Sequence, residues 1–218
     1  MAELINKSKS QNYVMSDKSI YILDDFRKDT MNELIGIIST MIRELPSAPT
    51  YNATTKIISP YETEDIKNPI IDIFIDSNGG DTNMLNNLST LLNFAKARGA
   101  IIRTTVLSRA YSCGSLLAIQ GTPGFRIMSH AAEHMIHFGS LGLYAESEKM
   151  VLHLIERQLE RKRLTHDKYK TYTKIPHNKL EDLSKTEGEI WDAEECLEYS
   201  LCDWILGENG ILTSRNSR

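Results

Sequence analysis

The sequence predicts an α/β domain, because apolar strand-like runs alternate with segments of helical periodicity. A compact apolar run at residues 70–75 ends in a Gly-Gly turn, and apolar residues at helical spacing follow over residues 84–95. The pattern repeats with a β-branched strand at residues 100–107 and a short small-residue helix at residues 112–119. Alternation of this kind is typical of α/β folds, and a chain of 218 residues favours one domain over two.

Three segments precede the first of these strands. Residues 1–19 are polar, which predicts a mobile N-terminal arm and argues against a secretory signal. Residues 30–33 (Thr-Met-Asn-Glu) fit a capping box and open an amphipathic helix that Pro46 ends. Prolines and small polar residues over residues 46–69 then predict a surface insertion.

The second half of the chain continues the alternation. The expected elements are strands at 125–128 and 134–138, a long charged helix at 146–164, a helix at 193–199 and an apolar segment at 201–206. Residues 20–207 therefore form the expected domain, and residues 208–218 a C-terminal tail.

Composition narrows the function classes. A hydrophobic fraction of 41% with a formal charge of −4 suggests neither nucleic acid nor an anionic membrane as a partner. The apolar runs fall short of the ~20 residues that a membrane span needs. Cys113, Cys196 and Cys202 are an odd number without close pairing, as expected for free thiols of a reducing compartment. We therefore expect a cytoplasmic protein.

Ser112 is a candidate nucleophile, since it stands where a strand passes into a helix among small neighbours. The amide of Cys113 would then point at an oxyanion formed on an attacked carbonyl. Ser112 could equally be an ordinary helix N-cap.

Two further positions could serve the same chemistry. Gly79 and Gly80 would supply a second oxyanion donor, although a plain turn explains them equally well. A calcium loop is excluded, because the EF-hand pattern needs an acid or amide where Gly80 stands and a Glu where Asn87 stands. His137 lies at the end of an expected strand, where it could act as general base or be a satisfied core histidine.

The order and spacing of these residues resemble the proteolytic subunit of Clp protease (ClpP). Residues 76–80 (Asp-Ser-Asn-Gly-Gly) are similar to the family's Asn-Ser-Pro-Gly-Gly, and residues 110–115 (Ala-Tyr-Ser-Cys-Gly-Ser) to its Ala-Ala-Ser-Met-Gly-Ala. Residues 134–137 (His-Met-Ile-His) resemble its Val-Met-Ile-His, and residues 193–203 its Ala-x-Glu-Ala-x-Glu-Tyr-Gly-Leu-x-Asp. The resemblance covers about residues 20–207 and implies a ClpP/crotonase-like fold of repeated β-β-α units.

The resemblance also implies roles and partners. Ser112 would attack the peptide bond, His137 would be base and then acid, and the amides of Gly79 and Cys113 would hold the oxyanion. Residues 146–170 would form a protruding handle through which two heptameric rings meet. The implied partners are further copies of this chain or a ClpP paralogue, unfolded polypeptides, and an AAA+ unfoldase that uses the ATP. No cofactor or metal is implied for this chain.

One departure from the family concerns the third member of the catalytic triad. The family's aspartate position falls on Gly188, and glycine cannot orient an imidazole. Glu187 is the tentative replacement, with Glu189 next to it and Asp192 farther away. The sequence therefore predicts a serine endopeptidase of weak activity, and the alternative is an impaired ring subunit that acts as scaffold or regulator.

Two rival enzymes share parts of the pattern. Residues 130–134 (His-Ala-Ala-Glu-His) match the H-x-x-E-H motif, in which two histidines on one helical face bind zinc. That zinc peptidase needs a helix, whereas the flanking residues predict strands. Crotonase relatives that act on acyl-CoA share the oxyanion architecture but need no Ser and His at these two positions.

Overall fold

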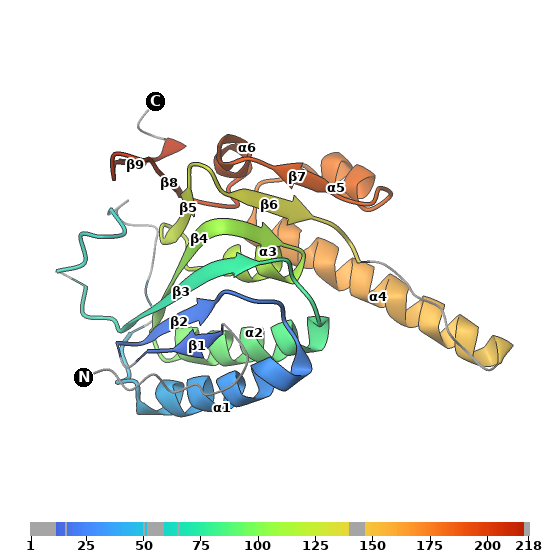
Figure 1. Cartoon of the computed structure of the whole chain (residues 1–218), viewed down its shortest axis with the longest axis horizontal. Helices are drawn as coiled ribbons and strands as arrows, with labels where there is room; N and C mark the ends of the chain where they lie inside the picture. Colours follow the sequence, from blue (N-terminus) through green and yellow to red (C-terminus); the bar gives the residue numbers. More distant parts are fainter. Residues whose placement is uncertain are drawn as a thin grey trace.

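The α/β class is confirmed by the computed structural model, which describes residues 12–15, 17–49, 51, 59–64, 66–139 and 147–215 (Figure 1). One sheet runs in the order β1-β2-β3-β4-β5-β8-β9, parallel from β2 to β8 and antiparallel at its two edges. Its strands are β1 (Tyr13–Val14), β2 (Ser19–Ile22), β3 (Ile70–Ser77), β4 (Ile101–Tyr111), β5 (Arg126–Ser129), β8 (Trp204–Leu206) and β9 (Leu212–Thr213). Two further strands, β6 (Glu133–Ile136) and β7 (Glu189–Trp191), leave this path at β4.

The strand β4 changes its partner along its length. Its first half pairs with β5, with Thr104 opposite Arg126, and its end pairs with β6, with Arg109 opposite Glu133. The register of β3 against β4 shifts between Ile75 and Ser77. The carboxyl ends of β3, β4 and β6 therefore meet at one edge of the sheet, where loops carry ligands in folds of this class.

Helices cover the sheet and extend beyond it. They are α1 (Lys28–Glu44), α2 (Thr82–Ala97), α3 (Cys113–Ala118), α4 (Glu148–Tyr172), α5 (His177–Leu183) and α6 (Ala193–Glu198). Figure 1 shows α1 and α2 side by side along one face, while α4 projects from the body. Ile71, Ile73 and Ile75 are fully buried, as the period-2 pattern of β3 requires. None of the helices in the described ranges is long and apolar enough to cross a membrane.

Two segments near the ends of the described chain form strands where the sequence predicts an arm and a tail. Part of the expected arm forms β1 and β2, where Tyr13 stacks on Tyr21 with ring centroids 4.5 Å apart. Residues 1–11 of that arm lie outside the described residues. The expected tail supplies β9, which pairs with β8. Both additions occupy sheet edges, where backbone pairing can recruit a segment with little apolar periodicity.

The first helix also differs from its prediction. It begins at Lys28, its N-cap is Arg27, and no side chain caps it, so the expected capping box at residues 30–33 is wrong. Thr30 instead donates to the carbonyl of Arg27 from inside the helix. Of the insertion expected at 46–69, the described residues are irregular, and Asn68 ties them to Pro49 and Gly99 through its side-chain amide.

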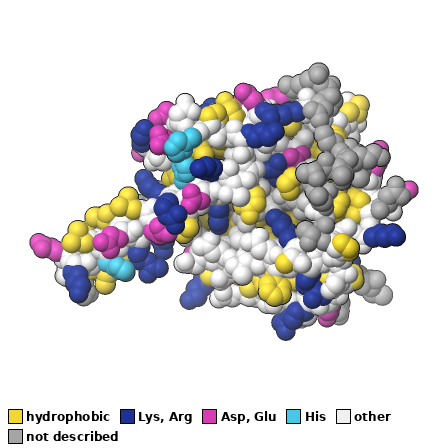
Figure 2. Space-filling model, turned by 180° about the vertical axis from the view of Figure 1, so that it is seen from behind, with side chains coloured by type: hydrophobic (Ala, Val, Ile, Leu, Met, Phe, Trp, Pro, Cys, Tyr) yellow, Lys and Arg dark blue, Asp and Glu magenta, His cyan; other side chains and the backbone are white. Residues whose placement is uncertain are grey.

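The helix α4 is the projecting element, and it is longer than predicted. Only Gln158 and Tyr169 are buried along it, while Leu152 and Leu159 are 62% and 61% exposed. Figure 2 shows apolar side chains along the projecting part, as expected for a surface that packs on another chain. Residues 140–146 precede the helix and lie outside the described residues, and 146 was the expected first residue of the handle.

Candidate active site

Ser112 occupies a strained turn between β4 and α3. Its φ of 54° and ψ of −113° are unusual for a residue with a side chain and cost about 1–3 kcal/mol. The turn is held on both sides, because the Ser112 amide donates to the Met135 carbonyl at 3.0 Å and the Ser112 carbonyl accepts from the Leu116 amide at 3.1 Å. The side chain makes no capping hydrogen bond to α3. The N-cap interpretation therefore does not explain this serine, whereas an exposed nucleophile does.

The Gly79–Gly80 turn lies directly against Ser112. Gly79 has a φ of +105°, and a Cβ there would lie 2.6 Å from the Ser112 Cβ and 3.1 Å from the Cys113 amide nitrogen. Backbone hydrogen bonds to Phe26 fix the turn, from the Phe26 amide to the Gly79 carbonyl and from the Asp81 amide to the Phe26 carbonyl. A side chain would thus fill the space before the Cys113 amide, so the bare glycine keeps that space open.

The amides around this space differ in their present partners. The Gly79 N–H donates to the Ser77 hydroxyl at 3.1 Å. Gly80, and not Gly79, is among the residues that line the adjacent pocket. The Cys113 thiol donates to the Gly80 carbonyl at 3.2 Å, and burial raises the pKa of that thiol to about 11. Cys113 therefore stays a neutral thiol and is no rival nucleophile to Ser112.

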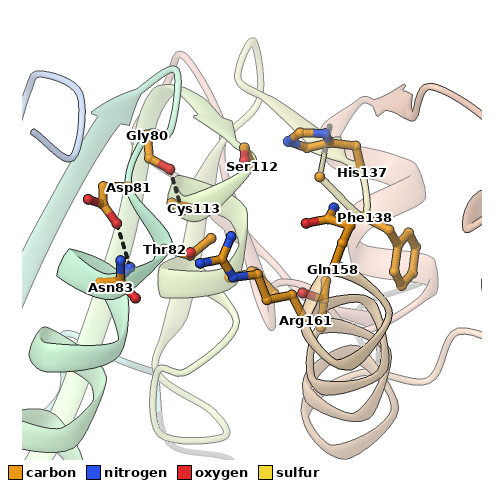
Figure 3. A pocket seen from close by; sticks show the side chains of 13 residues that line it. Gly80, Asp81, Thr82, Asn83, Ser112, Cys113, His137, Phe138, Gln158 and Arg161 are labelled. Atoms are coloured by element: carbon orange, nitrogen blue, oxygen red, sulfur yellow. Dashed lines mark hydrogen bonds between the residues drawn. The ribbon is translucent and has the colours of Figure 1, made fainter. Parts of the chain in front are cut away.

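His137 follows β6 and faces the same pocket. Ser112 and His137 both line it, and in the view of Figure 3 the His137 ring extends toward Ser112. No hydrogen bond joins the two side chains in the described part of the chain. Burial lowers the pKa of His137 below its ordinary value of 6.5, which keeps the imidazole neutral at physiological pH. A neutral imidazole beside a serine hydroxyl can act as general base.

The expected carboxylate partner of His137 is not in place. Strand β7 pairs antiparallel with β6, and Gly188 with a φ of +116° packs directly on His137. A Cβ on Gly188 would lie 2.7 Å from the His137 Cβ and 2.8 Å from the Ile136 carbonyl oxygen. Glu187 is exposed, and the Glu189 carboxylate accepts from the Trp191 indole at 3.0 Å. The role of Glu187 as third member stays a prediction, which no contact of the described residues supports.

The zinc motif is overturned by its secondary structure. His130 lies in a turn, while Glu133 and His134 begin β6, so the two histidines do not share a helical face. His134 is fully buried with its Nδ1 3.0 Å from the Ser115 hydroxyl, and His130 contacts Glu208 at 3.3 Å. No cluster of three or more potential ligands among His, Cys, Asp and Glu occurs in the ranges that the structure describes.

His134 belongs to a buried polar cluster beneath α3. The Ser115 hydroxyl lies 3.0 Å from the His134 ring and also accepts from the Tyr169 hydroxyl at 3.0 Å. Burial and, to a lesser degree, Arg126 lower the pKa of His134 to about 3. This histidine is therefore a neutral support for the helix that begins next to Ser112, and it joins β6 to α4 through Ser115.

One wall of the pocket was missed by sequence reasoning. Gln158, Arg161 and Thr165 of α4 line it together with the turn residues Gly80 and Asp81. The three α4 positions share one helical face, a spacing that was present in the sequence. Their charged surroundings resemble an ordinary solvated surface, so the spacing carried no signal without the packing of α4 against the site.

Comparison with known proteins places the chain in a family. The Clp protease family model matches residues 11–209. The chain is 32% identical over 143 residues to the ATP-dependent Clp protease proteolytic subunit of Leuconostoc citreum, covering 64% of this chain and 68% of the relative. The protein of the same name from Lactococcus lactis subsp. lactis is 29% identical, over 64% of this chain and 68% of the relative. The one from Streptococcus suis is 28% identical, over 73% of this chain and 81% of the relative. The expected resemblance and the ClpP/crotonase-like fold are thereby confirmed.

Proposed function

This chain belongs to the Clp protease family, and from that membership we propose that it is a serine endopeptidase subunit acting on unfolded polypeptides. The observation that carries the proposal is the placement of Ser112, on a strained turn, in one pocket with the neutral imidazole of His137. A hydroxyl held beside a neutral base is the arrangement that nucleophilic peptide cleavage requires.

The proposed reaction follows from these positions. The Ser112 oxygen attacks the peptide carbonyl while the His137 imidazole takes its proton, and the Cys113 amide binds the oxyanion. Gly79 is the second donor and exchanges its contact with Ser77 for that oxyanion. His137 then protonates the leaving amine, and an acyl group remains on Ser112. Water activated by His137 releases the acyl group and restores the hydroxyl.

The working unit that we propose is a Ser112–His137 pair with weak orientation of the imidazole. Loss of the carboxylate from a Ser-His-Asp triad costs about 10⁴ in turnover, because the imidazole tautomer is no longer fixed. Burial lowers the pKa of His137, which keeps the ring neutral but also makes it a weaker base, so it does not replace the missing carboxylate. We therefore expect slow hydrolysis, with Glu187 as a third member only if the chain around Gly188 moves.

The proposed setting is a closed chamber of the Clp type. We propose that copies of this chain, alone or with a paralogue, form heptameric rings that meet through α4. Its exposed Leu152 and Leu159 suit such a contact. An AAA+ unfoldase would deliver polypeptides and use the ATP, so the chain itself would need no cofactor.

The test is labelling of the assembled protein with a fluorophosphonate, which reacts with activated serines. We expect labelling and peptide hydrolysis that Ser112→Ala abolishes and that His137→Ala lowers by about 10³-fold or more. The matched control is Ser108→Ala, an exposed serine of β4 outside the pocket, which should leave both unchanged. Labelling that survives Ser112→Ala would contradict the proposal.

A second candidate function rests on Gly188. Because glycine packs against His137 where the family has aspartate, the chain could serve as a scaffold or regulator of active subunits. Particle mass would separate the two functions: a ring without fluorophosphonate labelling supports the scaffold, and a ring with labelling supports the peptidase.

A further inference from the structure

The helix α4 brings a cation into the pocket that contains Ser112. Arg161 projects from α4 across the pocket toward Thr82 at the start of α2, as Figure 3 shows. Its guanidinium forms no ion pair or hydrogen bond with the rest of the described chain. Arg163, two positions later, instead binds Glu160 and Asp167 at 2.7 and 2.9 Å. Of the three arginines of α4, Arg163 is thus neutralised at the surface, and Arg161 is the one that lines the pocket.

Gln158 points to a ligand at the same place. Its side chain is only 8% exposed and lines the pocket, and its amide has no hydrogen-bond partner within the described ranges. In Figure 3 the amide extends from α4 into the pocket below His137. With no partner from the protein, the amide can hydrogen-bond a polar group that binds in the pocket. Arg161 lies one helical turn from Gln158 on the same face, so one ligand could contact both.

The acidic residue of this pocket, Asp81, already accepts a hydrogen bond from the start of α2. Asp81 is the N-cap of α2, and its carboxylate accepts from the Asn83 amide at 2.7 Å. Its charge therefore faces the positive end of a long helix, and it forms no ion pair with Arg161 in the described structure. Hydroxyls of Thr82 and Thr165 complete this polar side of the pocket. The lining offers donors to an anion more than it offers an apolar slot.

We propose that this pocket selects a carboxylate of the substrate, bound by Arg161 and Gln158 beside Ser112. A guanidinium binds a carboxylate through two parallel hydrogen bonds, and the Gln158 amide can donate a third. The carboxylate could belong to an acidic side chain next to the cleaved bond or to the free C-terminus of a chain. The inference rests on the proposed function only in that Ser112 is taken as the cleaving group.

The first arm of the test is hydrolysis by the assembled protein. The substrates are end-blocked fluorogenic peptides that differ only in the residue before the cleaved bond, which is Glu, Gln or Leu. We expect kcat/KM for the Glu peptide to exceed that for the Gln peptide by about tenfold, as a charge-assisted contact predicts. Arg161→Gln should remove this preference. Arg161→Glu should transfer it to a peptide with Lys.

The matched control is Arg157→Gln, which removes the same charge one turn earlier on α4 at an exposed site outside the pocket. We expect Arg157→Gln to keep the tenfold preference. Gln158→Leu should reduce it, since the amide donor is replaced by an apolar group of similar size. A preference that survives Arg161→Gln, or that Arg157→Gln removes equally, would overturn the proposal.

The second arm measures binding and needs no turnover. Fluorescein-labelled peptides ending in a free carboxylate or in an amide, and end-blocked Glu and Gln peptides, are titrated into Ser112→Ala protein by fluorescence polarisation. A carboxylate preference lost on adding Arg161→Gln supports the inference even if wild type cleaves nothing, which would refute only the proposed function. The peptide that shows it identifies side chain or C-terminus. Equal affinity for all four peptides would overturn the inference.

Discussion

The two sides of the candidate site differ in how many hydrogen bonds hold their residues in place. On the nucleophile side, Ser112 is fixed by backbone hydrogen bonds to β6 and α3, and the Gly79 turn is fixed by Phe26. On the histidine side, His137 follows the last residue of β6, and no side-chain hydrogen bond to it occurs in the described residues. The backbone thus fixes the proposed nucleophile and the proposed oxyanion space, while no side chain of the described residues orients the proposed base.

The difference separates features that the backbone conformation maintains from a feature that depends on one side chain. Ser112 needs a strained backbone, and several neighbouring elements maintain it at a cost in stability. Orientation of the His137 imidazole would need only one carboxylate side chain, and Gly188 lies against His137 without one while β6 and β7 remain paired. A feature carried by one side chain can thus be absent without loss of the fold.

The largest effect on peptide hydrolysis is expected from Gly79→Ala, which changes the Ser112 side of the site. The added Cβ would lie 2.6 Å from the Ser112 Cβ and 3.1 Å from the Cys113 nitrogen, so it blocks the oxyanion space. We expect peptide hydrolysis to fall about 10²-fold or more. The control is Gly210→Ala, which shares a positive φ but meets no atom within 4 Å, and should retain activity. Equal losses in the two variants would show that backbone strain alone is responsible.

The next largest effect on turnover is expected from Gly188→Asp, which changes the His137 side of the site. The new Cβ would lie 2.7 Å from the His137 Cβ, so the substitution displaces the imidazole before a carboxylate can orient it. We expect turnover to fall about tenfold, and Gly188→Ala should cause a similar loss. Kinetic assays of both variants against wild type measure this. A rise in turnover for Gly188→Asp alone would show that the histidine side retains room for a triad.

A third prediction concerns the support beneath the nucleophile side. His134 has a pKa of about 3 in the folded chain because it is buried, against 6.5 when unfolded. Below pH 6.5 the unfolded state binds a proton that the folded state does not, so folding stability falls by up to about 1.4 kcal/mol per pH unit from this group. Urea unfolding across pH 7 to 5 should show this slope, reduced in His134→Gln and unchanged in His153→Gln, where the histidine is exposed.

The smallest effects are expected from the carboxylates beside Gly188. Glu187 is exposed, and Glu189 binds the Trp191 indole, so neither contacts His137 in this structure. Glu187→Gln and Glu189→Gln should each change kcat less than about twofold, since a surface carboxylate contributes little. A fall in kcat of about 10²-fold or more in Glu187→Gln alone would identify Glu187 as the third member of the triad. His137 would then be held in place by a side chain, as Ser112 is held by the backbone.

Much of the fold, and the local settings of the proposed pair Ser112 and His137, could be predicted from local patterns. The period-2 burial of β3 and the turn after it are properties of neighbouring residues, as is the small-residue setting of Ser112. What failed depended on segments far apart in the chain. The helix α1 begins at Lys28, before the expected capping box at residues 30–33, and the H-x-x-E-H motif lies in a turn and a strand instead of a helix.

By itself, the sequence determined the α/β class, the strand-to-helix turn at Ser112 and the strand leading to His137, because each depends on periodicity and small residues within one segment. Only the tertiary structure decided that Gly188 packs on His137, and that Arg161 and Gln158 enter the same pocket. The physical reason is that these contacts join β7 and α4 to residues distant in the chain. Side-chain contacts between distant segments follow from how the elements pack, and no local pattern encodes that.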